Sequence, residues 1–436
     1  MKVLFITNLY PPNAIGGYEW LCYQVATEFA ANAHRVVVLT SDYGGGEASY
    51  PGQVLYRRLR LFADPEDIYR PFEVGTEERH SIAAANQMEL HAVIAAEHPE
   101  VIFAWNLFYL DPSLLNGLVD GCPVVFMLTD NWLIAAHDPP FLDEFFREHV
   151  FGSVPFPRLR SDAGRWCGLP TRGYHAPAQP RLALPHGAIF SSRFVRRFYA
   201  EAGIGFRDST VIYNGVKLPE MPPESFADRA HLVDPDELRL LIAGRVVSLK
   251  GVHTAIEALV RLDLVDCPLR IRLTVLGDRR DSEYEQYLTE LIVATGTGGL
   301  VTFAEPIRES GLFGLFQQHD IYLFPSLYEP FSLTLIHALA AGIPTIASNV
   351  GGNIEIVLDG KSGLLFRKGD PKDLARAIGT LAKQPVLRQA VSKEARRVAR
   401  EYTFSRMVGG MTEYLAKTVE AEPQSQASAI VADHVV

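Results

Sequence analysis

Two cations stand together in one loop in the second half of the chain. Arg245 and Lys250 lie five residues apart after the apolar run 238–243, with Gly244 and Gly251 on either side. Glycine lets a backbone approach a ligand closely, and ligands of open parallel sheets bind outside the carboxyl ends of the strands. Isolated loop cations are usually only solvated charges. The shared position at a strand end instead favours a site in which both cations bind one diphosphate.

A second segment joins an acid to the start of a helix. Glu329 precedes Ser332, a predicted helix N-cap, and His337 lies about a turn and a half inside that helix. The first N–H groups of the helix, near Leu333 and Thr334, offer about half a positive charge to a phosphate. One ligand can therefore meet Glu329 and His337 at different points. The alternative is a buried helix with one hydrogen-bonded histidine.

The loop after the first predicted strand contains two adjacent glycines. Gly16 and Gly17 stand before the predicted helix 18–33 and let the backbone come close to a ligand at the helix N-terminus. Their spacing differs from G-x-G-x-x-G, which disfavours a nicotinamide-type dinucleotide site. A flexible turn without a ligand is the alternative.

No metal or cofactor site is predicted. The four cysteines are widely spaced and form no C-x-x-C pair, so the sequence predicts neither a disulfide framework nor a zinc cage, and it favours a reducing, cytoplasmic location. The histidines show no metal-ligand spacing of the H-E-x-x-H kind and are expected to be structural. Among them are His34, His137, His186 and His253.

Composition argues against several other classes of protein. Apolar residues make up 48% of the chain and charged residues 21%, as in globular proteins. A formal net charge of −10 gives no general reason to bind nucleic acid. The N-terminal apolar run is too short for a signal peptide, and an Asp-Pro pair interrupts the most apolar stretch, residues 101–119, so no membrane span is expected. Peripheral membrane contact stays possible through one basic cluster, although a solvated face is the simpler interpretation of it. The cluster is Arg193, Arg196 and Arg197.

The elements that must position these residues alternate along the chain. Short β-branched runs and amphipathic stretches of about 10 to 15 residues follow one another, which predicts an α/β protein with parallel sheets covered by helices. A length of 436 residues favours two domains, and the strand pattern restarts in the second half, so each half has its own sheet. The predicted strands are 3–7, 35–40, 101–105, 124–129, 188–191 and 210–212, then 238–243, 271–276, 301–303, 321–324, 345–347 and 363–366.

Three segments do not follow this alternation. Residues 216–236 contain four prolines among acidic residues and form the predicted linker, with the domain boundary near Lys217. Residues 138–185 combine prolines, aromatics and arginines, which is typical of a functional lid or insertion that can shape an acceptor site. From Glu420 onward the chain lacks a periodic apolar face and is predicted to be disordered.

Five motifs in the right order resemble the retaining glycosyltransferases of family 4, which have the GT-B fold. The likeness covers nearly the whole chain, and each motif lies at a predicted strand end. Residues 402–417 also look like the last helix of that family. The motifs are Tyr10-Pro-Pro with Gly16-Gly17-x-Glu19, Val-Ile-Tyr-Asn-Gly-Val at 211–216, Gly244-Arg with Lys250-Gly251, Val275-Leu-Gly277, and Pro325-Ser with Glu329, Gly342-x-Pro344 and Gly351-Gly352-x-x-Glu355.

The resemblance implies two Rossmann-like doubly wound domains facing a central cleft. It implies an acceptor-binding domain over residues 1–216, a nucleotide-sugar-binding domain over 217–400, a helix over 401–419 that crosses back to the first domain, and a disordered tail over 420–436. The implied reaction moves a sugar from a UDP-, GDP- or ADP-linked donor to a hydroxyl of a sugar, a lipid-linked or a small-molecule acceptor. It proceeds with retention of configuration and without an essential metal.

The resemblance also implies roles for residues at the matching positions. Arg245 and Lys250 would hold the diphosphate and Glu329 would lie beside the donor sugar, which makes these three the implied catalytic residues. The implied acceptor-binding residues are Glu19, Thr129 and Asp130. Backbone contacts are expected to hold the base. The implied donor-binding residues are Gly16, Gly17, Gly244, Arg245, Lys250, Gly277, Pro306, Ile307, Glu329, Phe331, Ser332, Leu333, Thr334 and His337.

This chain departs from the family pattern at two positions. His337 stands where relatives usually have the second acid of E-x7-E, which holds the ribose hydroxyls. A carboxylate accepts from two adjacent hydroxyls, whereas a neutral imidazole has one acceptor and one donor, so altered ribose binding is expected. Thr129 stands where relatives commonly have a histidine, and its hydroxyl cannot act as an imidazole acid or base. Asp130 is a candidate acceptor contact, with capping of the next turn as the alternative.

Two other functions fit the same sequence. A sugar-nucleotide epimerase of this fold would convert the donor without any acceptor. A nucleotide-sugar-binding protein with weakened catalysis would fit the departures at Thr129 and His337. Glycosyl transfer is the function that the sequence favours.

Overall fold

The structure is a computed structural model that describes residues 1–46, 48–64, 66, 68, 75–111, 114, 122–151, 182–218, 233–234, 236–262 and 269–432. Most of the predicted insertion 138–185 and most of the predicted linker 216–236 lie outside these residues. No helix in the described part of the chain is long and apolar enough to cross a membrane.

The chain forms two compact units. The first comprises Met1–Phe145, Ser161–Ile212 and Met407–Val436, and the second comprises Phe146–Arg160 and Tyr213–Arg406. The last helix, α15, spans Phe404–Ala432. Since its residues from Met407 onward belong to the first unit, the chain completes the second unit and then returns to the first.

Helix α15 differs in length from the sequence expectation. Disorder is predicted from Glu420, whereas the helical backbone continues to Ala432; residues 433–436 lie outside the described part. The extension contains several alanines but also Pro423, which disfavours a helix interior, so its composition does not account for the added length.

A seven-stranded parallel sheet forms the first unit, in the order β3-β2-β1-β4-β5-β6-β7. Its central strands are buried on both faces, which explains why they read as continuous apolar runs. The sequence missed β3 because this edge strand carries two arginines and only a short apolar run, Val54-Leu55-Tyr56. The strands are β1 (Lys2–Ile6), β2 (Arg35–Ser41), β3 (Gln53–Leu59), β4 (Val101–Ala104), β5 (Val124–Leu128), β6 (Leu182–Phe190) and β7 (Ile204–Val211).

A six-stranded parallel sheet forms the second unit, in the order β10-β9-β8-β11-β12-β13. All six strands predicted in the second half of the sequence are present. They are β8 (Glu237–Ala243), β9 (Arg270–Leu276), β10 (Val301–Ala304), β11 (Ile321–Phe324), β12 (Thr345–Ser348) and β13 (Leu364–Phe366).

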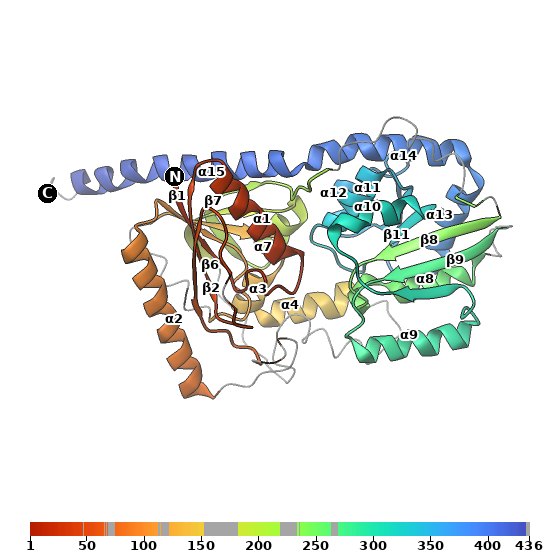
Figure 1. Ribbon diagram of the computed structural model, residues 1–436, viewed down its shortest axis with the longest axis horizontal. Coiled ribbons are helices and arrows are strands. Elements are labelled where there is room, and N and C mark those ends of the chain that lie inside the picture. Colours follow the sequence, from red (N-terminus) through yellow and green to blue (C-terminus); the bar gives the residue numbers. More distant parts are fainter. Residues whose placement is uncertain are drawn as a thin grey trace. The chain divides into compact units, whose positions relative to one another are not determined.

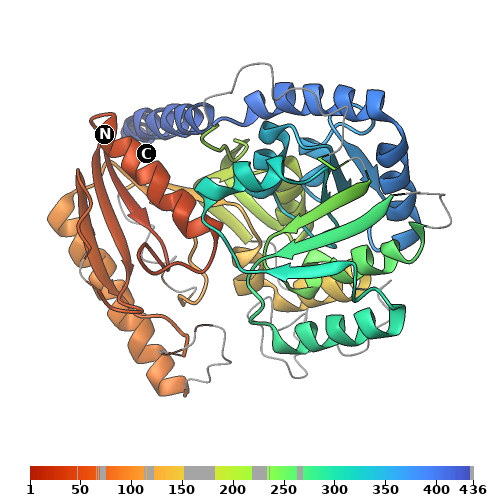
Figure 2. The same cartoon turned by 45° about the vertical axis from the view of Figure 1, so that its right-hand side comes forward.

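Helices cover both faces of each sheet. In the first unit, α1 and α2 lie on opposite faces of the sheet (Figure 2). In the second, α10 and α11 lie on one face and α8 and α9 on the other (Figure 1). The helices of the first unit are α1 (Gly17–Ala31), α2 (Thr76–Glu97), α3 (Trp132–His137), α4 (Pro139–Phe145) and α7 (Arg193–Glu201), together with α15. Those of the second are α8 (Val252–Leu259), α9 (Ser282–Thr295), α10 (Glu309–Gln317), α11 (Leu333–Ala341), α12 (Asn353–Ile356), α13 (Pro371–Lys383) and α14 (Pro385–Ala399).

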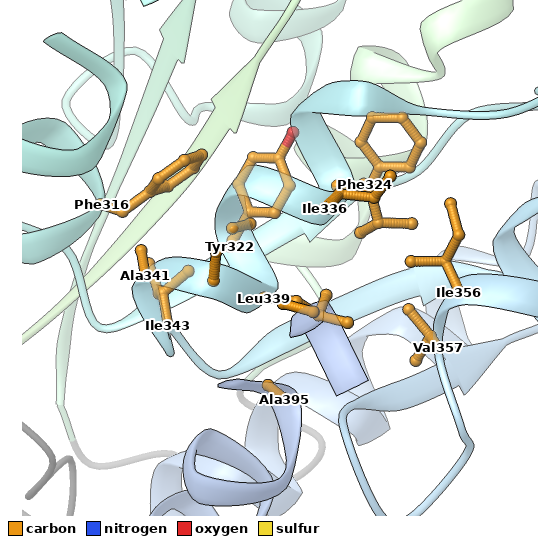
Figure 3. Close-up of a cluster of buried hydrophobic side chains, with 14 of the residues drawn as sticks. Phe316, Tyr322, Phe324, Ile336, Leu339, Ala341, Ile343, Ile356, Val357 and Ala395 are labelled. Atoms are coloured by element: carbon orange, nitrogen blue, oxygen red, sulfur yellow. The ribbon is translucent and has the colours of Figure 1, made fainter. Parts of the chain in front are cut away.

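The core of the second unit lies where β11, α11 and α14 meet (Figure 3). Tyr322 and Phe324 extend from β11 toward Ile336 and Leu339 of α11, and Ala395 of α14 closes the cluster; all are at most 5% exposed. Burying each large apolar side chain contributes about 1.5–3 kcal/mol. Because apolar neighbours surround most of α11, the helix is a rigid platform for whatever its N-terminus contacts.

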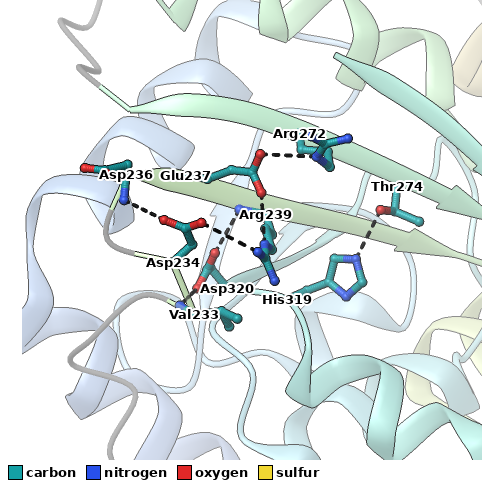
Figure 4. Close-up of polar contacts among 9 residues, drawn as sticks. All are labelled: Val233, Asp234, Asp236, Glu237, Arg239, Arg272, Thr274, His319 and Asp320. Carbon is teal, nitrogen blue, oxygen red and sulfur yellow. Dashed lines mark hydrogen bonds and ion pairs between the residues drawn. The ribbon is translucent and has the colours of Figure 1, made fainter. Parts of the chain in front are cut away.

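A polar network links the strands of this sheet at their amino ends (Figure 4). Glu237 accepts from Nε of Arg239 at 3.0 Å and from Nε of Arg272 at 3.2 Å. The hydrogen bond from Arg239 is the main reason that the pKa of Glu237 is lowered. Asp320 accepts from the backbone N–H groups of Val233 at 2.7 Å and Arg239 at 2.8 Å. The network therefore anchors the entry into β8 next to β9 and β11.

His253, on α8, is a structural histidine as expected. Its side chain is 4% exposed, and its Nδ1 lies 2.8 Å from the hydroxyl of Tyr284. Burial lowers the pKa of His253 to about 4, because the charged imidazolium would lose its hydration.

This burial predicts a loss of stability in acid. Between pH 6.5 and about 4 the unfolded chain takes up a proton on this histidine that the folded chain does not, so the free energy of unfolding falls as the pH falls. The expected contribution is about 3 kcal/mol. Urea unfolding from pH 7 to 4 should show a smaller loss in His253→Asn than in the wild type. Equal pH slopes in the two proteins would contradict the assignment.

Candidate active site

The predicted diphosphate site lies where the strand order of the second sheet reverses. Neighbours β8 and β11 are followed by loops whose helices lead away on opposite faces of the sheet. At such a point the two loops diverge and leave a crevice at the carboxyl ends of the strands. Arg245 and Lys250 follow β8, while Glu329 and α11 follow β11. The fold thus brings two segments, distant in sequence, to one edge of one sheet.

The two loops cross in direct backbone contact. The N–H of Leu327 donates to the carbonyl of Leu249 at 2.7 Å. Gly251 has a left-handed backbone with φ of 66°, and a Cβ atom there would overlap the carbonyl group of Pro325. Only glycine fits at this crossing. Gly251 is therefore needed for the packing of the two loops, in addition to the close approach to a ligand that the sequence suggests.

The crossing leaves polar groups without partners. The hydroxyls of Ser248 and Ser326, one in each loop, are buried and find no hydrogen-bond partner among the described residues. An unsatisfied buried hydroxyl costs free energy. The free-energy cost of these two unpaired hydroxyls is consistent with a region whose structure serves a function at the expense of local stability.

Lys250 and Glu329 meet at this crossing. Nζ of Lys250 lies 2.6 Å from Oε2 of Glu329, and their side chains are 24% and 8% exposed. The ammonium also lies 5.5 Å from the ring centre of Phe324. The backbone carbonyl of Glu329 accepts from the N–H of Gly352 at 2.9 Å. The pair is therefore held from both sides, with the partly exposed cation as its accessible end.

The N-terminus of α11 has the predicted cap. The hydroxyl of Ser332 accepts from the N–H of Leu335 at 3.1 Å. The amides of Leu333 and Thr334, in the first turn, have no acceptor inside the helix. Phe331 is buried and stacks on Tyr213, with ring centres 5.5 Å apart. This stacking and the cap fix the direction from which the helix starts.

Two glycines pack the neighbouring loops together. Gly277, after β9, has φ of 154°, and a Cβ atom there would overlap the carbonyl of Gly244. Arg245, which follows Gly244 in the sequence, is exposed. Its charge contributes to the lowered pKa of Asp278, although the hydrogen bond from Arg280 is the larger cause. Lys250 is thus held in an ion pair, and Arg245 extends toward solvent near Asp278.

His337 has an acidic partner that the sequence did not reveal. Its Nε2 lies 3.0 Å from Oε1 of Glu309, the first residue of α10. The His337 side chain is 13% exposed and that of Glu309 is 51% exposed. Pro306 and Ile307, expected near the base, are both exposed in the loop that leads to Glu309. No local pattern marks Glu309, because its partner belongs to another helix.

The acceptor-site candidates lie in the first unit: Glu19 on α1 follows β1, at the reversal point between β1 and β4, and Thr129 and Asp130 follow β5. Oε2 of Glu19 accepts from the N–H of Gly16 at 2.9 Å, and Oε1 accepts from the side chain of Asn106 at 3.3 Å. Gly16 and Gly17 are exposed at the start of α1. Glu19 is therefore a helix cap as well as a candidate ligand contact.

Two carboxyl groups of this unit have raised pKa values. Burial raises the pKa of Glu19 to about 7, and nearby Asp130 adds to the shift. Burial likewise raises the pKa of Asp130 to about 6. Asp130 accepts from the N–H of Trp132 at 3.1 Å, so the capping role considered from the sequence is present. Thr129 lies next to it, partly buried.

Two family models match the chain in succession. Residues 15–219 match the model described as Glycosyltransferase Family 4, and residues 224–398 match the model described as Glycosyl transferases group 1. The donor-site residues described above, from Gly244 to Gly352, fall within the second match.

Relatives with known activities cover the chain to different extents. The glycogen synthase of Mycobacterium tuberculosis is 25% identical over 440 residues, which span 100% of this chain and 99% of that protein. The D-inositol 3-phosphate glycosyltransferase of Geodermatophilus obscurus is 32% identical over 239 residues, 53% of this chain and 52% of that protein. The second kind of likeness thus extends over about half of each protein.

Solved structures share the fold at low sequence identity. Sucrose-phosphate synthase from Thermosynechococcus elongatus has a TM-score of 0.71 at 19% identity, over 96% of this chain and 99% of that one. Anabaena HepE in complex with UDP-glucose has a TM-score of 0.63 at 19% identity, over 96% of this chain and 100% of that one.

The loop crossing predicts unequal effects at two glycines with the same backbone conformation. Gly251 and Gly296 have φ of 66° and 68°, but a Cβ atom at 296 meets nothing within 4 Å. Gly296→Ala should lower the free energy of unfolding by about 1–2 kcal/mol, from the left-handed backbone alone. Gly251→Ala should lower it by roughly a further 1–3 kcal/mol, because the loops must separate. Urea unfolding measures both, and equal losses would mean that the crossing is not tight.

Proposed function

This chain is a glycosyltransferase of family 4 with the GT-B fold, and we propose that it moves a sugar from a nucleoside diphosphate sugar to an acceptor hydroxyl, with retention of configuration. The second unit binds the donor and the first unit binds the acceptor. The HepE structures that contain UDP and UDP-glucose support a donor of this class. The observation that carries the proposal is the pair of Lys250 and Glu329 at the reversal point of the second sheet.

The diphosphate is the leaving group, and the site supplies positive charge to it. In this proposal Lys250, Arg245 and the first amides of α11 all contact the diphosphate. Negative charge grows on the diphosphate as its bond to the sugar breaks, so these contacts strengthen in the transition state. Each charge-assisted hydrogen bond contributes roughly 1.5–3 kcal/mol.

Glu329 serves the sugar end of the donor. Its carboxylate accepts hydrogen bonds from sugar hydroxyls and lies close to the positive charge that develops on the ring during glycosyl transfer. In the unbound site it neutralises Lys250 at 2.6 Å. Donor binding exchanges this contact for two others, diphosphate with Lys250 and sugar with Glu329.

The same arrangement determines where the acceptor proton goes and why the transfer needs no metal ion. An oxygen of the departing phosphate takes the proton from the acceptor hydroxyl, which attacks from the face that the phosphate leaves. The protein's cations supply the positive charge that a metal ion supplies in other transferases, so we propose metal-independent transfer.

Glu19, Thr129 and Asp130 are the proposed acceptor contacts. The pKa values of Glu19 and Asp130, about 7 and about 6, mean that their charge changes near neutral pH. Their ability to donate a hydrogen bond to an acceptor oxygen is lost as the pH rises through these values. A KM for acceptor that does not change between pH 5 and 8 would remove these two residues from the acceptor site.

We also propose a cytoplasmic location. Cys22 and Cys122 are free thiols, in keeping with a reducing compartment. Cell fractionation of the tagged protein tests this.

Replacing the diphosphate-binding lysine should abolish most activity. A thermal-shift screen of UDP, GDP, ADP and dTDP with their sugars first identifies the donor, since binding at 100 times Kd stabilises a fold by about 2.7 kcal/mol. Lys250→Ala should then lower kcat by at least about tenfold, because charge stabilisation of the leaving diphosphate is lost.

Two further variants separate this effect from misfolding. Lys361→Ala removes an exposed lysine of the same unit and should leave kcat unchanged. Lys250→Ala leaves the buried carboxylate of Glu329 without its cation, so Lys250→Ala with Glu329→Gln restores neutrality and should unfold near the wild-type temperature while remaining inactive. Wild-type kcat in Lys250→Ala would end the proposed role.

The stereochemistry and metal independence are tested on the product. Proton NMR of the freshly formed glycoside should show the anomeric configuration of the donor, and the rate should be the same with and without EDTA. An inverted product or a rate abolished by EDTA would contradict the mechanism. Incubation of donor without acceptor should give no isomeric sugar nucleotide, whereas formation of one would favour an epimerase.

A further inference from the structure

The contact between His337 and Glu309 joins two helices of the second unit at the donor edge of the sheet. The histidine is the buried member, 13% exposed, and the glutamate is half exposed at 51%. His337 is fixed within α11, whose neighbouring residues Ile336 and Ala338 are completely buried. The immobile imidazole thus holds in place a carboxylate that reaches solvent. An exposed glutamate otherwise samples many rotamers, and ordering it for a ligand costs entropy.

The position of the pair along α11 says which part of a ligand it meets. His337 follows Thr334 by three residues, a rise of about 4.5 Å along the helix. Glu329 precedes the N-cap Ser332 by three residues. A diphosphate at that start therefore has one substituent toward Glu329 and the other toward His337. With the sugar beside Glu329, the nucleoside lies beside His337 and Glu309.

The loop before α10 suits a nucleoside. Ile307 is 42% exposed and stands two residues before Glu309. Its side chain offers an apolar surface to the flat face of a base. The same short segment therefore presents an apolar group and a carboxylate, which match the base and the hydroxylated ring of one nucleoside.

We propose that Glu309 binds the adjacent 2′ and 3′ hydroxyls of the donor ribose, and that His337 is the residue that positions it. This inference rests on the proposed nucleoside diphosphate sugar. A carboxylate accepts from two neighbouring hydroxyls at once, which a neutral imidazole cannot do. The acid for the ribose comes from α10 in this chain, and α11 supplies the histidine that orients it.

The test compares ribonucleotides with 2′-deoxyribonucleotides. Isothermal titration measures Kd of the wild type for UDP, GDP and ADP and for their 2′-deoxy forms. The best-bound ribonucleotide should bind roughly ten- to a hundredfold more tightly than its deoxy form, because the deoxy form lacks one hydrogen bond to a charged group.

Glu309→Gln is the informative variant. The preference for the ribonucleotide should fall to within about twofold, while the deoxy form should bind it about as well as it binds the wild type. Glu283→Gln changes an exposed first-turn glutamate of α9 and should keep the full preference. His337→Ala should lower the preference as well, because Glu309 loses its orientation. A purely structural role would weaken both nucleotides equally and leave their ratio unchanged.

A pair of exchanges tests whether the place of the carboxylate matters. His337→Glu alone puts two carboxylates in contact, so it should weaken ribonucleotide binding. Glu309→Gln with His337→Glu moves the acid from α10 to α11 and should recover a preference of at least about tenfold. Tighter ribonucleotide binding by His337→Glu alone would overturn the inference.

The outcomes separate this inference from the proposed function. If the wild type binds neither these three nucleoside diphosphates nor dTDP, the donor itself is wrong; binding of dTDP alone would overturn the ribose contact and leave the proposed function standing. If it binds one without a preference for ribose, or if Glu309→Gln keeps the wild-type ratio, Glu309 is not the ribose contact and the proposed donor stands.

Discussion

The backbone contact between the loops after β8 and β11 is the constraint on which the donor site depends. Parallel pairing brings the carboxyl ends of these neighbouring strands to one edge of the sheet. The missing side chain at Gly251 then lets one loop lie against Pro325 of the other. This approach brings Lys250 within 2.6 Å of Glu329, although the two lie in different loops. The buried, unpaired hydroxyls of Ser248 and Ser326 indicate that the contact has a local cost in stability.

The parts of the fold that follow from local chemistry could be predicted from the sequence. Strands buried on both faces appear as apolar runs, and the six strands of the second sheet were recognised in this way. The cap at Ser332 could also be predicted, because capping involves residues three apart. The edge strand β3 was missed, since one polar face and two arginines hide it. The helical backbone of α15 beyond Glu420 was missed because no periodic apolar face marks it and Pro423 argues against a helix there.

The candidate site was predictable as a set of positions but not as a set of contacts. Lys250 and Glu329 were both expected at the donor, yet nothing in the sequence indicates that they form an ion pair. Glu309 was not predicted at all, since its role depends on the packing of α10 beside α11. Asp130 was expected either to contact the acceptor or to cap a turn, and the turn contact is present. Pairing between distant elements is set by tertiary packing, which no single-sequence pattern records.

The charged network at the amino ends of β8, β9 and β11 stabilises one end of the sheet, while the candidate ligand site lies at the other end. Glu237, Arg239 and Asp320 fix the strands at the edge farthest from the donor loops. Side chains that face a ligand at the carboxyl edge, unlike the glycines of the loop crossing, can therefore be exchanged without loss of these contacts. The histidine on α11 and its glutamate partner on α10 illustrate such freedom. A sheet built in this way can accept new substrates through substitutions at the carboxyl ends of its strands, while the contacts at the amino ends preserve the fold.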